Sequence, residues 1–184
     1  MVRAPKAQTS RVVSRFFAGE ASLAVPDYLA SNLDVLFCGI NPGTRSAAQG
    51  RHYAHPSNHF YQCVHAAGIT SELLTPEHDV MFPTLAPHAL GLTNLAHRPT
   101  RRSEQLRTQE LECGVPALVH KVRQYKPRVV CFVGKQIGRV FEKVLAKKHC
   151  LGDAATLHLP RSVLGFWFDR SSGTKTFPAQ DGGG

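Results

Sequence analysis

The hydrophobic positions of this chain fall into short continuous runs that alternate with stretches of helical spacing. Residues 33–40 and 128–133 are almost unbroken apolar runs of strand length, which is typical of strands buried on both faces. Residues 89–95 form a shorter apolar segment that contains a glycine and is expected to be a strand or a turn. The pattern therefore predicts two buried strands and a third, weaker candidate.

Helical spacing follows these runs. A helix is expected over 57–68, and another over 103–125 with a kink or break at Pro116. A third is expected to start at Gly134-Lys135, and its apolar face consists of Ile137, Val140, Phe141, Val144 and Leu145. A short helix is also expected around residues 20–30. Strands that alternate with helices predict a parallel α/β sheet.

Length and charge change this picture in two ways. The chain has 184 residues, of which 42% are hydrophobic and 19% charged, and this fits one globular domain. We expect that domain at residues 20–168, after a basic flexible arm at 1–19 and before a polar tail at 169–184 that is disordered or truncated. The formal net charge of +9 makes nucleic acid the leading partner class.

Cysteine spacing and hydropathy bear on the compartment. The five cysteines have no paired spacing, which argues against a zinc ribbon or a disulfide framework and favours a reducing compartment. No apolar run approaches the ~18 residues of a membrane span, and no apolar segment of a signal peptide follows the N-terminal charges. A soluble intracellular protein without a membrane partner is expected.

The first candidate for chemistry is Gly39-Ile40-Asn41-Pro42-Gly43, at the carboxyl end of the first predicted strand. Ligands of open α/β sheets bind at such ends. The glycines allow close approach of a ligand, and Pro42 stiffens the turn and directs the Asn41 side chain. The alternative is a plain structural turn. Known phosphate loops are not indicated, since no G-x-G-x-x-G follows the strand and Gly134-Lys135 lacks the rest of a P-loop.

The segment 50–60 combines an aromatic ring, amides, imidazoles and cations, a composition suited to a nucleobase. Tyr53 could stack on a base and Asn58 could bind its edge. The alternatives are a packing aromatic for Tyr53 and a helix-capping amide for Asn58. A metal site at His52, His55 and His59 is a third interpretation, although no acidic or thiol partner lies at a supporting distance in the sequence.

Together these segments resemble the mismatch-specific uracil/thymine-DNA glycosylases, a family of the uracil-DNA glycosylase-like superfamily. The resemblance covers about residues 30–146. It rests on residues 34–43, His52-Tyr53, Pro56-x-Asn58-His59-Phe60, Gly91-Leu92-Thr93-Asn94-Leu95, Arg98-Pro99-Thr100, Tyr125-Lys126-Pro127-Arg128 and Val133-Gly134-Lys135, in that order. It implies a three-layer α/β sandwich with a central, mostly parallel twisted sheet flanked by helices.

The resemblance also implies site roles. Asn41 would position the water that attacks the anomeric carbon of a flipped deoxynucleotide. The base would be bound by Ile40, Ser46, His52, Tyr53 and Asn58, and the DNA phosphates by Arg98, Gly134 and Lys135. No metal or cofactor is implied.

The implied function is monofunctional excision of uracil or thymine from G·U and G·T mismatches in double-stranded DNA, a step of base excision repair. We expect a monomer, in the nucleus of a eukaryote or in the cytoplasm of a bacterium.

The C-terminal part departs from the family pattern. Family members continue with a strand, a Pro-Ser-rich loop that wedges into the duplex, and a terminal helix, whereas residues 151–184 show no convincing equivalent. The nearest candidate for the loop is Arg170-Ser171-Ser172-Gly173. The alternative function is therefore a catalytically impaired DNA-binding relative that lacks the wedge.

Overall fold

A parallel three-stranded sheet forms the centre of the protein. A computed structural model describes residues 25–147. Strands β1 (Val35–Gly39), β2 (Leu90–Asn94) and β3 (Val129–Phe132) lie in the order β2-β1-β3, all parallel. The strands predicted at 33–40 and 128–133, and the weaker candidate at 89–95, are confirmed. Because the strands are parallel, their three carboxyl ends lie at one edge.

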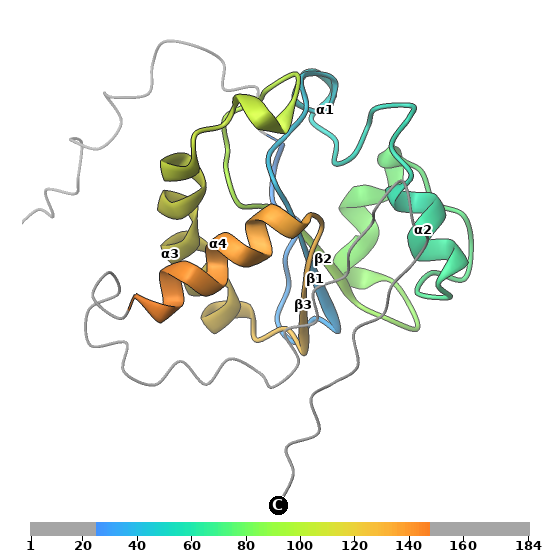
Figure 1. The fold of residues 1–184 in the computed structure, drawn as a ribbon. Helices are drawn as coiled ribbons and strands as arrows, with labels where there is room; N and C mark the ends of the chain where they lie inside the picture. Colours follow the sequence, from blue (N-terminus) through green and yellow to red (C-terminus); the bar gives the residue numbers. More distant parts are fainter. Residues whose placement is uncertain (1–24, 148–184) are drawn as a thin grey trace, which may run out of the picture.

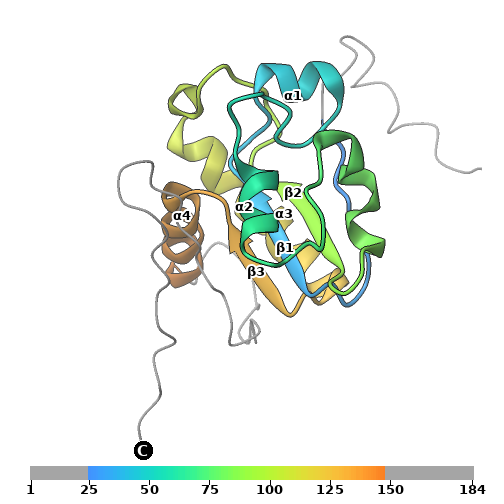
Figure 2. The same ribbon diagram turned by 90° about the vertical axis from the view of Figure 1, so that its right-hand side faces the viewer.

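Helices cover both faces of the sheet. The α-helices are α1 (Thr44–Gln49), α2 (Phe60–Ala66), α3 (Thr108–Tyr125) and α4 (Lys135–Ala146), and the 3-10 helices are η1 (Pro76–Thr84) and η2 (Ser103–Gln105). Helices α3 and α4 lie on one face of the sheet, and α2 and η1 on the other (Figure 1). From the side, α2 stands in front of the sheet and α3 behind it (Figure 2). The predicted three-layer α/β sandwich is confirmed.

Alternation along the strands builds two cores. Leu36 and Cys38 of β1 pack toward α3 and α4, while Phe37 between them packs against α2 and η1. Each large side chain buried in this way contributes about 1.5–3 kcal/mol. The continuous apolar run at 33–40 therefore reflects a strand covered on both faces.

Three helix predictions differ from the structure, and the first is the helix expected over 103–125, which begins only at Thr108, after the separate 3-10 helix η2. The helix expected at 20–30 is wrong for its described part, because Tyr28 instead forms an antiparallel bridge with Leu92 at the outer edge of β2, through two hydrogen bonds of 3.0 and 2.9 Å. The helix expected from residue 57 begins at Phe60. The sequence pattern gives no indication of helix α1, which begins directly after Gly43 and is capped at its C-terminal end by Gly50, with a φ of 63°.

Helix α3 continues through Pro116, so the expected kink or break does not end it. A proline inside a helix removes one hydrogen bond and costs about 3 kcal/mol. Burial offsets that cost, since this helix buries Leu111, Val115, Leu118, Val119 and Val122 against the sheet. Tertiary packing therefore keeps the helix continuous through Pro116.

Several predictions lie outside the described residues: the arm at 1–19, the domain limits at 20 and 168, the tail at 169–184 and the wedge candidate at 170–173. Within residues 25–147 no helix is both long and apolar enough to cross a membrane. The four cysteines of this range, Cys38, Cys63, Cys113 and Cys131, are all free thiols.

Candidate active site

The connections that leave the carboxyl ends of β1 and β2 run side by side. Leu95 N donates to Gly39 O at 2.9 Å, and Ala96 N donates to Ile40 O at 2.9 Å. The pairing resumes where Thr100 N donates to Pro42 O at 3.1 Å, within the parallel bridge between Gly43 and Thr100. This extended pairing brings residues 95–100 against the segment that contains Asn41.

The side-chain amide of Asn41 is held by that second segment. Its Nδ2 lies 2.8 Å from Arg98 O and 2.8 Å from Thr100 Oγ1, with a longer contact of 3.2 Å to Pro42 O. A carbonyl can only accept, so the Arg98 contact fixes which end of the amide carries the protons. Both N–H groups are thereby used, while Oδ1 accepts no hydrogen bond from any described residue and can accept one from a ligand or water.

The guanidinium of Arg98 is directed at α3. Nε lies 2.6 Å from Glu110 Oε1, and Nη2 lies 3.0 Å from Glu110 Oε2 and 3.0 Å from Gln105 O. The hydrogen bonds from Arg98 and from the Arg107 backbone lower the pKa of Glu110 to about 2. In this structure the Arg98 side chain thus connects its own loop to η2 and to the first turn of α3. Its contact with a DNA phosphate stays a prediction.

Tyr53 has a strained backbone and a buried hydroxyl. Its φ is 53°, in the left-handed region, and its ring stacks on Phe60 with centroids 4.0 Å apart. Burial raises the pKa of the phenol, so it stays neutral. The hydroxyl makes no hydrogen bond to any described residue. Such a buried, unpaired group often marks the position of a ligand or water.

Asn94 approaches the same point from β2. It pairs in register with Gly39, and its residue is only 8% exposed. A Cβ on Gly39 would lie 2.5 Å from Asn94 Oδ1 and 3.0 Å from the Tyr53 hydroxyl. Among the described residues the Asn94 amide makes no side-chain hydrogen bond. Glycine at position 39 thus lets two unpaired polar groups meet at the end of β1.

His52 lies beneath this site and is structural in the described geometry. It is 2% exposed, and its Nε2 lies 2.8 Å from the carbonyl oxygen of Pro26, so Nε2 carries the proton. Burial lowers the pKa of its imidazole, and the ring is therefore neutral. Its backbone N–H donates to Asp79 at 2.9 Å, and its carbonyl accepts from the Tyr61 hydroxyl at 2.9 Å.

Asp79 anchors the turn that carries His52 and Tyr53. Its carboxylate is fully buried and also accepts from Arg51 Nη1 at 2.7 Å. The turn is therefore held by η1 through Asp79, by α2 through Tyr61, and by the segment before β1 through Pro26. These three contacts, which we call the clamp, keep Tyr53 in its left-handed backbone conformation.

The remaining predicted residues connect elements around the edge. Ser46 Oγ accepts from Ala54 N at 3.0 Å and so ties α1 to the turn. Ile40 packs under Gly134, where a Cβ would lie 3.2 Å from the Ile40 side chain. Lys135 begins α4 directly after Gly134, at the same edge of the sheet. Ile40, Gly134 and Lys135 therefore surround the ends of β1 and β3.

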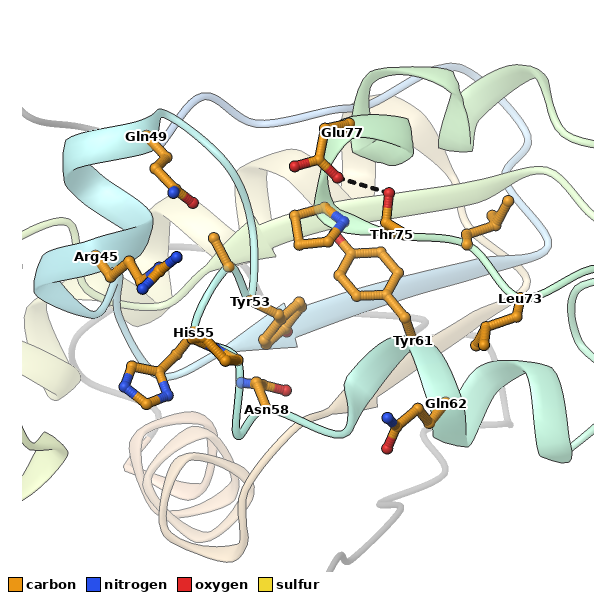
Figure 3. A pocket seen from close by; sticks show the side chains of 14 residues that line it. Arg45, Gln49, Tyr53, His55, Asn58, Tyr61, Gln62, Leu73, Thr75 and Glu77 are labelled. Atoms are coloured by element: carbon orange, nitrogen blue, oxygen red, sulfur yellow. Dashed lines mark hydrogen bonds between the residues drawn. The ribbon is translucent and has the colours of Figure 1, made fainter.

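A hollow of about 300 Å³ opens between α1, α2 and the segment before η1 (Figure 3). It is lined by Tyr53 and Asn58 together with polar side chains that include Arg45, Gln49, His55, Gln62 and Glu77. Asn58 Oδ1 accepts from Phe60 N at 2.9 Å, so this oxygen caps α2. Of the predicted base-binding residues, Tyr53 and Asn58 line the hollow, whereas Ile40, Ser46 and His52 do not.

A comparison with protein-family models decides the family. The model described as the uracil DNA glycosylase superfamily matches residues 26–178, most of the chain. This chain belongs to the uracil DNA glycosylase superfamily. The superfamily comprises hydrolases that act on N-glycosyl bonds in DNA. The match extends beyond residue 146, the limit of the family resemblance seen in the sequence, and includes residues 151–178.

The histidines of this glycosylase are engaged separately. His52 contacts Pro26 O, His55 Nδ1 lies 2.8 Å from Ser57 Oγ, and His59 Nδ1 lies 2.7 Å from Gln62 Oε1. Within residues 25–147 no three histidine, cysteine, aspartate or glutamate side chains are grouped so that they could hold a metal ion. The alternative metal site at His52, His55 and His59 gains no support from this geometry.

Four residues that contact the candidate site could not be singled out from the sequence: Thr100, Asn94, Asp79 and Glu110. Thr100 and Asn94 stand within the motifs at 91–100, but only the parallel register places them opposite Gly43 and Gly39. Asp79 and Glu110 contact partners that are distant in the sequence. Asp79 lies 27 residues from His52, and Glu110 lies 12 residues from Arg98. Their sequence neighbourhoods carry no pattern that points to the site.

Proposed function

We propose that this superfamily member hydrolyses the N-glycosidic bond of uracil or thymine mispaired with guanine in duplex DNA, and that Asn41 Oδ1 holds the attacking water. The observation that carries this proposal is the orientation of the Asn41 amide. Both of its N–H groups are bound, to Arg98 O and Thr100 Oγ1, so that Oδ1 is available as an acceptor.

The chemistry of an amide shapes the mechanism. Asn41 is neutral and cannot take up a proton strongly, so it orients water and contributes chiefly through position. Cleavage then depends on stabilising the departing base, on which negative charge develops. The Asn94 amide and the Tyr53 hydroxyl are unpaired polar groups at the end of β1 that can bind the polar edge of that base.

Base binding is proposed to use the Tyr53 ring as a platform, because a base stacked on an aromatic ring contributes about 1–3 kcal/mol. Phe60 supports the ring from one side. Ile40 and Ser46 are proposed to shape the wall near Asn41, and His52 to act through the backbone of the turn. Asn58 has Oδ1 engaged on α2, so its Nδ2 is proposed as the group that meets the base.

Mismatch preference follows from the same argument. Extruding a base costs a few kcal/mol, and least where the pair is already weak. An enzyme without a strong general base gains most from a substrate that is easily extruded and has a good leaving group. G·U and G·T pairs meet the first condition, and uracil meets the second better than thymine.

The experiment is a panel of matched duplexes that contain G·U, G·T, A·U or G·C at one position, incubated with chelator and then treated with alkali. We expect abasic sites in the order G·U, then G·T, with A·U slower and G·C uncleaved. Equal cleavage of G·U and A·U would contradict mismatch selection. Salt-sensitive DNA binding without base release on any duplex would instead indicate the non-catalytic relative.

A further inference from the structure

The Arg98–Glu110 ion pair has a well-defined, two-point geometry. The guanidinium meets the carboxylate through two parallel hydrogen bonds, Nε to Oε1 at 2.6 Å and Nη2 to Oε2 at 3.0 Å. The side chains are 52% and 32% exposed, so the pair adds little to stability. A bidentate arginine–carboxylate contact nevertheless fixes orientation better than a single charge pair does. Its value therefore lies in holding Arg98 in one position.

Glu110 is itself fixed at the start of α3. Its Oε2 also accepts from the backbone N–H of Arg107 at 2.9 Å, and Arg98 Nη2 donates to Gln105 O at 3.0 Å. The side chain of Arg98 is thus tied to the loop that leads into α3 and to the first turn of that helix. Helix α3 packs on the sheet through a buried apolar face, and so provides a firm base.

Arg98 connects this base to the candidate site through its backbone. The residue whose guanidinium meets Glu110 also supplies the carbonyl that accepts from Asn41 Nδ2 at 2.8 Å. We propose that Glu110 is a positioning residue for Asn41, acting through Arg98. This inference rests on the proposed role of Asn41 as the group that holds water. Release of Arg98 lets its carbonyl move, and a displacement of about 1 Å costs about 100-fold in rate.

The competing role for Arg98, contact with a DNA phosphate, makes the opposite prediction. If Arg98 served a phosphate, Glu110 would compete for it, and loss of Glu110 would strengthen DNA binding without slowing base release. If Glu110 positions Asn41, its loss slows base release and changes DNA affinity only as much as any equal change of charge nearby. The two roles therefore separate into a rate effect and an affinity effect.

The test compares Glu110→Gln with Glu104→Gln, which removes the same charge from an exposed residue of η2 that does not contact Arg98. Under single-turnover conditions on a G·U duplex we expect a 10- to 100-fold lower rate for Glu110→Gln than for Glu104→Gln, with dissociation constants within about 3-fold of each other. Equal rates for the two variants would overturn the proposal.

Two further variants guard against a merely structural effect. Arg98→Lys keeps the charge but cannot make the two-point guanidinium contact with Glu110. We expect the same loss of rate as in Glu110→Gln, and full activity of Arg98→Lys would overturn the proposal. In an Asn41→Ala background, Glu110→Gln should cause no further loss, because both changes affect the same water. A second loss of 10-fold or more in that background would mean that Glu110 acts elsewhere.

A readout that needs no turnover is the side-chain NH₂ signal of Asn41, assigned by its disappearance in Asn41→Ala. Glu110→Gln should shift this signal and speed its exchange with solvent, whereas Glu104→Gln should leave it unchanged. An unchanged signal in Glu110→Gln would overturn the positioning role even if the wild-type chain released no base. Wild-type turnover with a signal and rate insensitive to Glu110 would reject this inference alone and leave the proposed function intact.

Discussion

Gly39, the last residue of β1, lies directly against two polar side chains of the candidate site. Its missing side chain leaves room for Asn94 Oδ1 and the Tyr53 hydroxyl, both within 3.0 Å of where a Cβ would be. Neither atom is the end of a long flexible chain, so neither can move away cheaply. The residue type at this one position therefore controls access of two side chains to the end of the strand.

Gly39→Ala is expected to lower the free energy of unfolding by about 1–3 kcal/mol, the usual cost of overpacking. It should also slow base release, because Asn94 and Tyr53 must move. Thermal unfolding and single-turnover assays measure the two effects. Gly43→Ala is the control for added volume, since nothing lies within 4 Å of its Cβ position and any loss of stability there reflects only its N-cap position before α1. Equal stability of Gly39→Ala and the wild type would contradict the packing described here.

Tyr53→Phe separates structure from function at one atom. The hydroxyl is buried without a partner among the described residues, so its removal should leave stability unchanged or raise it by about 1 kcal/mol. If the hydroxyl meets the base, the rate of base release should fall about 10-fold. A variant that is less stable yet fully active would show that the hydroxyl is a structural group.

Protonation of His52 should weaken the fold in acid. Burial lowers the pKa of its imidazole below the ordinary 6.5, so the folded protein keeps the ring neutral where the unfolded chain takes up a proton. The stabilising effect is full above pH 6.5 and is lost as the pH falls through the lower pKa of the folded state. Unfolding by denaturant between pH 7.5 and about pH 5 should show this decline, and His52→Gln should flatten it. An identical slope in that variant would exclude His52 as its source.

At the scale of elements, the turn at 51–53 depends on η1, α2 and the segment before β1 rather than on its own sequence. Asp79 of η1 is the most deeply buried of these supports, accepting from Arg51 and from the His52 backbone. Its loss leaves two donors without their acceptor. The conformation of Tyr53 should then relax toward a more common backbone geometry.

Asp79→Asn is expected to lower the free energy of unfolding by about 1–3 kcal/mol, because one buried charge-assisted contact is lost. The value of kcat/KM for base release should fall as well, since Tyr53 loses its support. Glu72→Gln, at an exposed position, is the matched control. Normal activity in a destabilised Asp79→Asn variant would show that the clamp serves folding only.

The elements that sequence predicted well are those defined by local pattern. The strand at 33–40 is an apolar run covered on both faces, and α4 repeats apolar residues at helical spacing. Helix α1 escaped prediction because six residues between two glycines show no such repeat. The helix expected at 20–30 failed in its described part because pairing of Tyr28 with β2 outweighed local preference.

The same distinction applies to the site. Asn41 could be named as a candidate because it follows a strand end in an Asn-Pro-Gly segment, while its role as the residue that positions water comes from the family resemblance and stays a prediction. The roles of Thr100, Asn94 and Glu110 could not be predicted, because they depend on parallel register and on a loop that folds back to α3. Local sequence predicts where a site opens, while tertiary contacts determine which side chains complete it.

At the scale of the whole molecule, the net charge of +9 should make DNA binding strongly dependent on salt. Lys135 stands at the sheet edge that carries the site, and Lys143 stands near the other end of the same helix. Lys135→Ala is expected to reduce the slope of log affinity against log salt by about one, and Lys143→Ala to leave it unchanged. Equal slopes in both variants would remove Lys135 from the DNA interface.

The central claim is that Asn41 holds the water for base release, and the most direct test is the single-turnover rate of Asn41→Ala on a G·U duplex in the presence of chelator. Thermal unfolding should first establish that the variant is folded. We predict that the wild-type protein releases uracil and that Asn41→Ala is slower by at least about 100-fold, with DNA affinity largely retained. Equal rates for a folded Asn41→Ala variant and the wild type would contradict the assignment of Asn41.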